Sequence, residues 1–178
     1  MYVSEVKTIP PEVFQTPLQE LVYQTLEKLK VPYERVDTEE AITMEDCVAI
    51  NQRLDMDMVK TLFLCNKKKT LFYLYVTTDQ KSFDTKKFCE ALEISRVSFA
   101  PQELFEEILG VKVGAATIYS VLSDWDRTIQ VVFDKDVVEM EYYGCSDGTT
   151  TGYMKVKTED ILQKIIPYSK HKFRVIKI

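Results

Sequence analysis

The stretch MVKTLFLCN, residues 58–66, is followed after three lysines by TLFYLYVTT, residues 70–78. Both runs are rich in aromatic and β-branched side chains, which are typical of strands. Because only a short lysine segment separates the two runs, they are predicted to form neighbouring, paired strands from Met58 to Asn66 and from Thr70 to Thr78. The sequence therefore places a sheet at the centre of the fold.

Helix signals lie on both sides of this pair. Thr16 and Pro17 supply a capping hydroxyl and a first-turn proline, and apolar residues then recur on one face through Lys30. TMED, residues 43–46, resembles a capping box and predicts a second helix towards Leu54. Further helices are predicted from Asp84 through Leu92, from Pro101 to Leu109 with Gly110 as its stop, and over EDILQKII, residues 159–166, with Thr158 as its cap.

Several shorter apolar runs predict additional strands. They are VPYERVD (31–37), RVSFA (96–100), TIQVVFD (128–134), DVVEMEYY (136–143), YMKVK (153–157) and KFRVIKI (172–178). Strands mixed with helices in this order predict an α+β fold. We expect a single domain over residues 1–178. Its mixed, mostly antiparallel sheet should have about six or seven strands, with helices packed around it.

The composition limits the functional classes. The formal net charge is −5, which argues against broad, charge-driven binding of nucleic acid. No apolar run approaches the roughly 18 to 20 residues that span a bilayer, and the first residues lack the apolar core of a signal peptide. We therefore expect a cytoplasmic protein without membrane contact. Residues 161–178 contain five lysines or arginines and no acid, which predicts either a solvated terminal strand or a local phosphate contact.

Histidine and cysteine are too sparse for several kinds of site. The four cysteines lie far apart, without a CxxC pair, and His171 is the single histidine. A zinc site is therefore not expected, and the thiols are predicted to be reduced and mostly buried. A Ser-His-Asp or Cys-His enzyme is nearly excluded, because no other imidazole could act as the base.

The five glycines fall in two stretches, GVKVG (110–114) and GCSDGTTTG (144–152). Gly114 is followed by two alanines and Thr117, so small side chains surround a run of backbone amides that suits a carboxylate, phosphate or carbonyl oxygen. A plain tight turn is the alternative. The second stretch, with hydroxyls from Ser146 onward, predicts either a binding loop or a hairpin loop. It matches neither a P-loop nor a dinucleotide-binding fingerprint.

Lys60 is the charged candidate. It lies between Val59 and the apolar run that begins at Leu62, inside a predicted strand. Burying an unpaired ammonium group is costly, so a lysine is rarely placed inside such a strand. It either extends from an edge strand to solvent or projects into a cleft to meet an anionic ligand.

In this order, these pieces resemble the YbaK/prolyl-tRNA-synthetase-associated domain family of free-standing aminoacyl-tRNA deacylases, and in particular its PrdX-like, prolyl-tRNA-editing branch. The resemblance covers about Leu18 to Ile166. It rests on VPYERVDTEEAIT (31–43), VKTLFL with FYLYV, ELFEEILGVKVGAATIYSVLSD (103–124), and IQVVFDKDVVEMEYY with TEDIL. It implies hydrolysis of the ester that joins a wrong amino acid, expected to be alanine, to proline tRNA, with no metal, cofactor or covalent intermediate. Mischarged tRNA would be the partner, with a transient association with prolyl-tRNA synthetase as a further expectation.

The resemblance also implies roles for individual residues. Lys60 would hold the 3′-terminal phosphates. The amides of Gly114 and Ala115 would face the ester carbonyl, while water attacks with help from the terminal ribose hydroxyl. The expected walls of the aminoacyl pocket are Thr43, Thr117, Ser146 and Gly148.

The chain departs from the family pattern at several of these positions. Val113 and Ile118 stand where the pattern has prolines, and Thr61 where it has asparagine. Thr38 replaces a histidine, and a His-Pro pair falls on Ser146 and Asp147. These departures favour a second hypothesis: a non-catalytic module of the same fold that binds a tRNA end or a nucleotide. A hydrolase for another aminoacyl ester or an acylated metabolite is the third.

Overall fold

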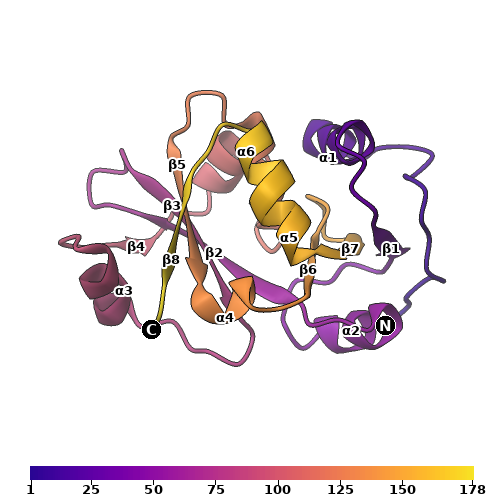
Figure 1. Ribbon diagram of the computed structural model, residues 1–178, viewed down its shortest axis with the longest axis horizontal. Helices are drawn as coiled ribbons and strands as arrows, with labels where there is room; N and C mark the ends of the chain where they lie inside the picture. Colours follow the sequence, from indigo (N-terminus) through magenta and orange to yellow (C-terminus); the bar gives the residue numbers. More distant parts are fainter.

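The computed structural model describes all 178 residues, and its strands form two sheets that meet side by side (Figure 1). The larger sheet has the strand order β4-β2-β3-β5-β8, and the smaller has the order β1-β7-β6. Most neighbours are antiparallel, but β5 runs parallel to both β3 and β8. The strands are β1 Glu34–Asp37, β2 Val59–Cys65, β3 Phe72–Thr78, β4 Ser98–Phe99, β5 Ile129–Asp134, β6 Tyr142–Ser146, β7 Gly152–Lys157 and β8 Phe173–Ile176.

Helices cover the sheets and their junction. Figure 1 shows the C-terminal helix, in yellow, running along the boundary between the two sheets. This helix comprises α5 Thr158–Asp160, a π-helical segment Ile161–Ile165 and α6 Ile166–Tyr168. The others are α1 Pro17–Lys28, α2 Cys47–Leu54, α3 Thr85–Leu92, a π-helical segment Phe105–Leu109, a 3-10 helix Ile118–Ser123 and α4 Lys135–Val138. None of them is long and apolar enough to cross a membrane.

Three apolar clusters hold these layers together. The largest joins both sheets to α1 and the C-terminal helix, and it contains Phe63 of β2 and Met154 of β7. A second cluster packs Phe88 of α3 against the other face of the larger sheet. The third packs Ile50 of α2 against β1 and β7. The two faces of β2 therefore serve different neighbours: Phe63 faces the sheet junction and Leu64 faces α3.

The structure confirms the α+β class and the central strand pair. β2 and β3 are antiparallel, with Lys60 directly opposite Thr77. The Thr16 hydroxyl accepts a hydrogen bond from the Gln19 amide (3.0 Å), and the Asp84 carboxylate accepts one from the Lys87 amide (3.0 Å). These are the predicted helix caps. Gly110 ends its helix with φ of +71°, as the glycine stop requires.

Three sequence-based expectations need correction. The strands number eight and are divided between two sheets, because the β6–β7 hairpin pairs with β1 instead of extending the larger sheet. The predicted strand from Asp136 is wrong in its first half: Lys135–Val138 forms α4, because the Asp134 carboxylate caps it by accepting from the Asp136 amide (2.9 Å). Thr158 begins the C-terminal helix, but its buried hydroxyl has no hydrogen-bond partner and does not cap it.

Candidate active site

A pocket of about 320 Å³ opens where the larger sheet meets the smaller one. β2 forms one side of it, and the two strands of the β6–β7 hairpin form the other. β4 pairs only with Leu64 and Cys65, so the edge of β2 from Val59 to Leu62 has no strand beside it on that side. The other contributors are the loop before α2, with Ala41 to Met44, and the loop around Gly114.

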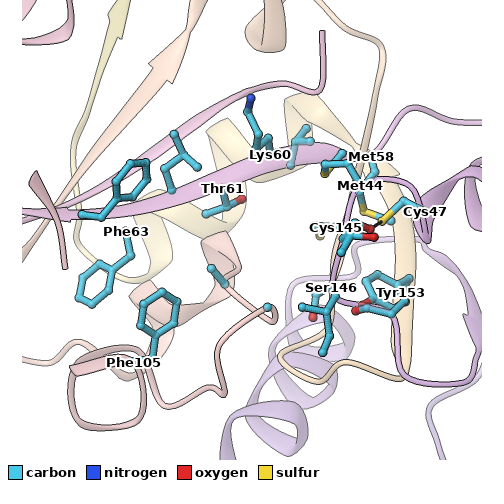
Figure 2. A pocket seen from close by; sticks show the side chains of 18 of the residues that line it. Met44, Cys47, Met58, Lys60, Thr61, Phe63, Phe105, Cys145, Ser146 and Tyr153 are labelled. Carbon is cyan, nitrogen blue, oxygen red and sulfur yellow. Dashed lines mark hydrogen bonds between the residues drawn. The ribbon is translucent and has the colours of Figure 1, made fainter. Parts of the chain in front are cut away.

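The pocket wall is mainly apolar and has two distinct ends. Figure 2 shows Phe63 and Phe105 at one end, where their rings meet edge to face with centroids 5.3 Å apart. Sulfur-bearing side chains gather at the other end, and these are Met44, Cys47, Met58 and Cys145. No aspartate or glutamate lines the pocket, and Lys60 is its one charged residue. Such a wall suits an apolar group more than a charged one.

Lys60 lies at the rim of this pocket. Figure 2 shows its side chain leaving β2 on the side opposite Thr61, so the ammonium does not enter the space between the sheets. The ammonium donates a hydrogen bond to the Lys81 carbonyl oxygen and forms no ion pair with any carboxylate. Lys60 is therefore a hydrogen-bonded cation without an ion pair, and its ammonium lies on the face of β2 opposite the space between the sheets. Two of its three N–H donors stay available for a ligand.

The loop around Gly114 faces the pocket from the other side. Gly114 has φ of +93°, and a Cβ added there would lie 2.7 Å from Ile42 Cγ2, so glycine lets this loop approach the loop before α2. Gly114 and Ala116 line the pocket, and the N–H group of neither donates to another group of the protein. These two amides are the free donors that an anionic or carbonyl oxygen could use.

The expectation for Ala115 does not fit this geometry. Its amide donates to the Lys112 carbonyl oxygen (3.0 Å) within a tight turn, and its side chain is fully buried. The tight turn of the alternative reading is therefore present and consumes one amide, whereas the reading as an oxygen-binding loop stays a prediction. The turn leaves the amide on either side of Ala115 without an acceptor.

Two of the predicted hydroxyl residues line the pocket, but their hydroxyls already have partners. The Thr43 hydroxyl accepts from the Asp46 amide (3.2 Å), and the Asp46 carboxylate accepts from the Thr43 amide (3.0 Å). These are the reciprocal bonds of the predicted capping box, but they close a turn just before α2, which begins at Cys47. The Ser146 hydroxyl donates to the Thr149 carbonyl oxygen (2.6 Å). Both residues therefore shape the wall and its loops.

The other two predicted wall residues lie outside the pocket lining. Thr117 is fully buried and donates its hydroxyl to the Ser146 carbonyl oxygen (2.8 Å), so it supports the wall from behind. Gly148 borders a neighbouring cavity together with Ala115 and Gly110. Its amide donates to the Ser146 hydroxyl (3.0 Å), as in the hairpin-loop alternative. The structure thus brings together Thr43, Lys60, Gly114 and Ser146 from the predicted set.

Several lining residues carry no sequence signal of their own. Met44, Met58, Phe105 and Tyr153 are apolar or aromatic residues, of the types that also fill protein cores. Tyr153 is buried, and its hydroxyl donates to the Ala41 carbonyl oxygen, which fastens the loop before α2 to β7. Only the meeting of two sheets turns these core-like residues into a pocket wall.

The titratable groups of the pocket limit its chemistry. Burial raises the pKa of the Cys145 thiol to about 12 and that of the Cys47 thiol to about 11, so both thiols stay protonated near neutral pH. The single histidine lies elsewhere: His171 Nε2 is 2.8 Å from Asp124 Oδ2, and this buried pair fastens the segment before β8. The pocket therefore offers neither a thiolate nor an imidazole.

The fold and this site define a class of protein. Residues 38–164 match the family model described as the aminoacyl-tRNA editing domain. Because this match spans more than half of the chain, the protein belongs to the aminoacyl-tRNA editing domain family.

Individual relatives agree with this assignment. The chain is 26% identical over 160 residues to the prolyl-tRNA editing protein ProX of Acetoanaerobium sticklandii, covering 90% of this chain and 97% of that protein. It is 22% identical to prolyl-tRNA synthetase associated domain-containing protein 1 of Danio rerio, covering 82% and 80% of the two chains. A crystal structure of a candidate trans-editing enzyme for prolyl-tRNA synthetase superposes with a TM-score of 0.67 at 14% identity, over 93% of this chain and 99% of the other, and shows the same fold.

Proposed function

We propose that this protein is a trans-editing deacylase that hydrolyses the ester of misacylated tRNA, with alanine on proline tRNA as its main substrate. One observation carries the proposal: an apolar pocket has two free amides, of Gly114 and Ala116, on one side and an unneutralised ammonium, of Lys60, at its rim. The aminoacyl group enters the apolar space. The terminal phosphate stays outside it, where Lys60 can reach it.

The proposed reaction uses one water molecule and has no intermediate in which the aminoacyl group is bound covalently to the protein. The water oxygen attacks the ester carbonyl carbon, the bond from that carbon to the ribose oxygen breaks, and the proton lost by water ends on the ribose oxygen. The amides of Gly114 and Ala116 stabilise the negative charge that develops on the carbonyl oxygen. Because the pocket offers no imidazole or thiolate, the neighbouring ribose hydroxyl orients the water, and the protein contributes positioning and electrostatic stabilisation.

The mainly apolar pocket wall supports an amino acid with an uncharged, apolar side chain as the substrate. Met44, Met58, Phe63 and Phe105 leave a space of about 320 Å³ for the side chain and the reacting ester together. Steric selection of this kind is limited, since one methylene group is worth only ~1–3 kcal/mol. We therefore expect graded preference among alanine, serine and cysteine esters. A tRNA substrate also implies a cytoplasmic location, and transient association with prolyl-tRNA synthetase would supply misacylated product directly.

The proposal is tested by a deacylation panel. Excess protein is incubated with alanyl-, seryl- and cysteinyl-tRNA, prepared on proline tRNA and on the cognate tRNAs, and released amino acid is followed over time. The expected result is release well above the buffer rate, fastest for alanine on proline tRNA. Tight tRNA binding without release would instead establish the non-catalytic module. Release that uncharged tRNA does not inhibit would indicate a hydrolase for another ester.

Replacement of the pocket thiols tests whether catalysis is covalent. Cys47→Ala and Cys145→Ala are each expected to keep deacylation within about threefold of the wild-type rate, because protonated thiols are poor nucleophiles. Cys145→Ala should lower the unfolding temperature, since it leaves a gap in a fully buried position. The rates are measured at a temperature where circular dichroism shows both variants folded. A folded variant without turnover would show that a thiol takes part.

A further inference from the structure

A second lysine, Lys81, lies in the loop that follows β3, and its backbone contacts the Lys60 side chain. The Lys81 carbonyl oxygen accepts the hydrogen bond from the Lys60 ammonium. The Lys81 side chain points to other partners: its ammonium contacts both carboxylate oxygens of Asp134, at 3.0 and 2.8 Å, and Asp136 at 2.9 Å. One residue therefore holds a neighbouring cation with its backbone and two carboxylates with its side chain.

These groups form one row across the α3 face of the larger sheet. Lys60 on β2 is directly opposite Thr77 on β3, and directly opposite residues point to the same face. The Thr77 hydroxyl donates to Asp134 Oδ2 (2.8 Å) at the end of β5. The order along the row is a cation, a hydroxyl and a carboxylate, with the Lys81 ammonium on the carboxylate.

Asp134 stays ionised because of this arrangement. Its side chain is fully buried, and burial alone would raise the pKa of the carboxyl group. Hydrogen bonds from the Lys81 ammonium, the Asp136 amide and the Thr77 hydroxyl outweigh that effect and hold the pKa below its ordinary value. Without Lys81, a buried carboxylate and the carboxylate of Asp136 would lack their cation. Lys60, the other cation of this row, would then be attracted towards these acids and away from a ligand.

We propose that Lys81 is a positioning residue for Lys60. Its carbonyl oxygen fixes the Lys60 ammonium at the pocket rim, and its own ammonium neutralises Asp134 and Asp136, so that Lys60 keeps its charge for the phosphate of the tRNA end. The inference rests on the proposed function for the identity of that phosphate. It assigns to the loop after β3 a role in the site, although Lys81 does not line the pocket.

A double-mutant cycle tests this proposal through tRNA affinity, which can be measured whether or not turnover occurs. The variants are Lys60→Met, Lys81→Met and both together, with uncharged proline tRNA as the probe. Each single variant is expected to weaken binding about tenfold, equivalent to about 1.4 kcal/mol. The double variant should be no weaker than Lys60→Met, because both changes remove the same contact. In all three variants, the slope of log Kd against the logarithm of the salt concentration should be smaller than in the wild type by about 0.7, as expected for the loss of one phosphate contact.

Lys7→Met is the matched control. The Lys7 ammonium is also 2.8 Å from a carboxylate, that of Asp37, and its side chain is 32% exposed against 29% for Lys81, but it is remote from Lys60 in the hydrogen-bond network. The affinity of the Lys7→Met variant for uncharged proline tRNA should stay within about twofold of that of the wild type. Lys81→Gln, which can still donate to Asp134, serves if Lys81→Met does not fold, and Lys81→Arg should retain binding.

The outcomes separate this inference from the proposed function. Wild-type tRNA affinity in a folded Lys81→Met or Lys81→Gln variant overturns the positioning role. The role is also overturned if the loss of affinity in the double variant equals the product of the two single losses. A non-additive cycle in a protein that releases no amino acid supports the positioning role and removes the deacylase proposal. A non-additive cycle that also appears in kcat/KM supports both.

Discussion

Replacing Lys60 with methionine is expected to lower kcat/KM for misacylated tRNA by about 10- to 100-fold. A charge-assisted hydrogen bond contributes ~1.5–3 kcal/mol, and each 1.4 kcal/mol corresponds to a factor of about ten. The loss should appear mainly as a higher KM with little change in kcat, because the contact is made to a phosphate that does not react. Single-turnover and steady-state deacylation of alanylated proline tRNA measure the two contributions.

The fold should survive this change. Lys60 forms no ion pair, and its methylene groups lie at a half-buried position that methionine can fill. The unfolding temperature is therefore expected to stay close to that of the wild type. Lys7→Met controls for the loss of one positive charge. A folded Lys60→Met protein with wild-type kcat/KM would remove the lysine from the mechanism, and the pocket would then have to work through its amides alone.

Much of the fold follows from short-range signals. Thr16, Thr43 and Asp84 each form the side-chain hydrogen bonds that their spacing predicts, because a cap involves only residues three positions apart. β2 and β3 are joined by a short turn, so their pairing is also local. Such signals are present in the sequence whatever the rest of the chain does.

Other features go against the local strand propensity or depend on contacts between residues far apart in the sequence. The segment after Asp134 has the β-branched residues of a strand, yet β5 ends there and Asp134 caps a helical turn. The division into two sheets depends on β1 pairing with β7, more than a hundred residues later. Where tertiary pairing determines which strands form and where they end, local strand propensity is the weaker effect.

The candidate site could be predicted only in part from the sequence, because some of its features also depend on contacts that residue types do not reveal. Lys60 could be selected as a candidate because a charge inside an apolar strand is unusual in itself, and Gly114 because the chain has few glycines. The choice between Ala115 and Ala116 depended on one turn hydrogen bond, from the Ala115 amide to Lys112, which residue types do not reveal. The pocket wall of methionines and aromatic rings is indistinguishable from core in the sequence.

Asp147 is the most consequential residue that sequence reasoning left without a role. Its carboxylate is fully buried in the β6–β7 hairpin loop and accepts hydrogen bonds from Gln19 Nε2 (2.9 Å) and from the Tyr23 hydroxyl (2.8 Å), both on α1. Its other oxygen accepts from the Thr149 hydroxyl (2.8 Å). A Cβ at Gly152 would overlap this carboxylate, so the last glycine of the second stretch makes room for it. Asp147 thus ties the first helix to the hairpin that forms one pocket wall.

Asp147→Ala is therefore expected to lower the free energy of unfolding by about 2–6 kcal/mol, since it leaves two buried donors, of Gln19 and Tyr23, without an acceptor. Asp147→Asn should cost less, because one acceptor oxygen remains, and Asp126→Ala, an exposed aspartate, should change stability by no more than about 0.5 kcal/mol. Urea unfolding followed by circular dichroism measures all three.

The functional consequence of this contact follows from the position of β6, which carries Cys145 and Ser146 into the pocket wall. If α1 and the hairpin lose their shared anchor, the wall should loosen before the larger sheet unfolds. Deacylation by Asp147→Ala should then fail at a lower temperature than the loss of its helical signal. In the wild type the two losses should coincide. Coincident losses in the variant, or a destabilisation below about 1 kcal/mol, would show that packing alone holds the hairpin and that the buried carboxylate is replaceable.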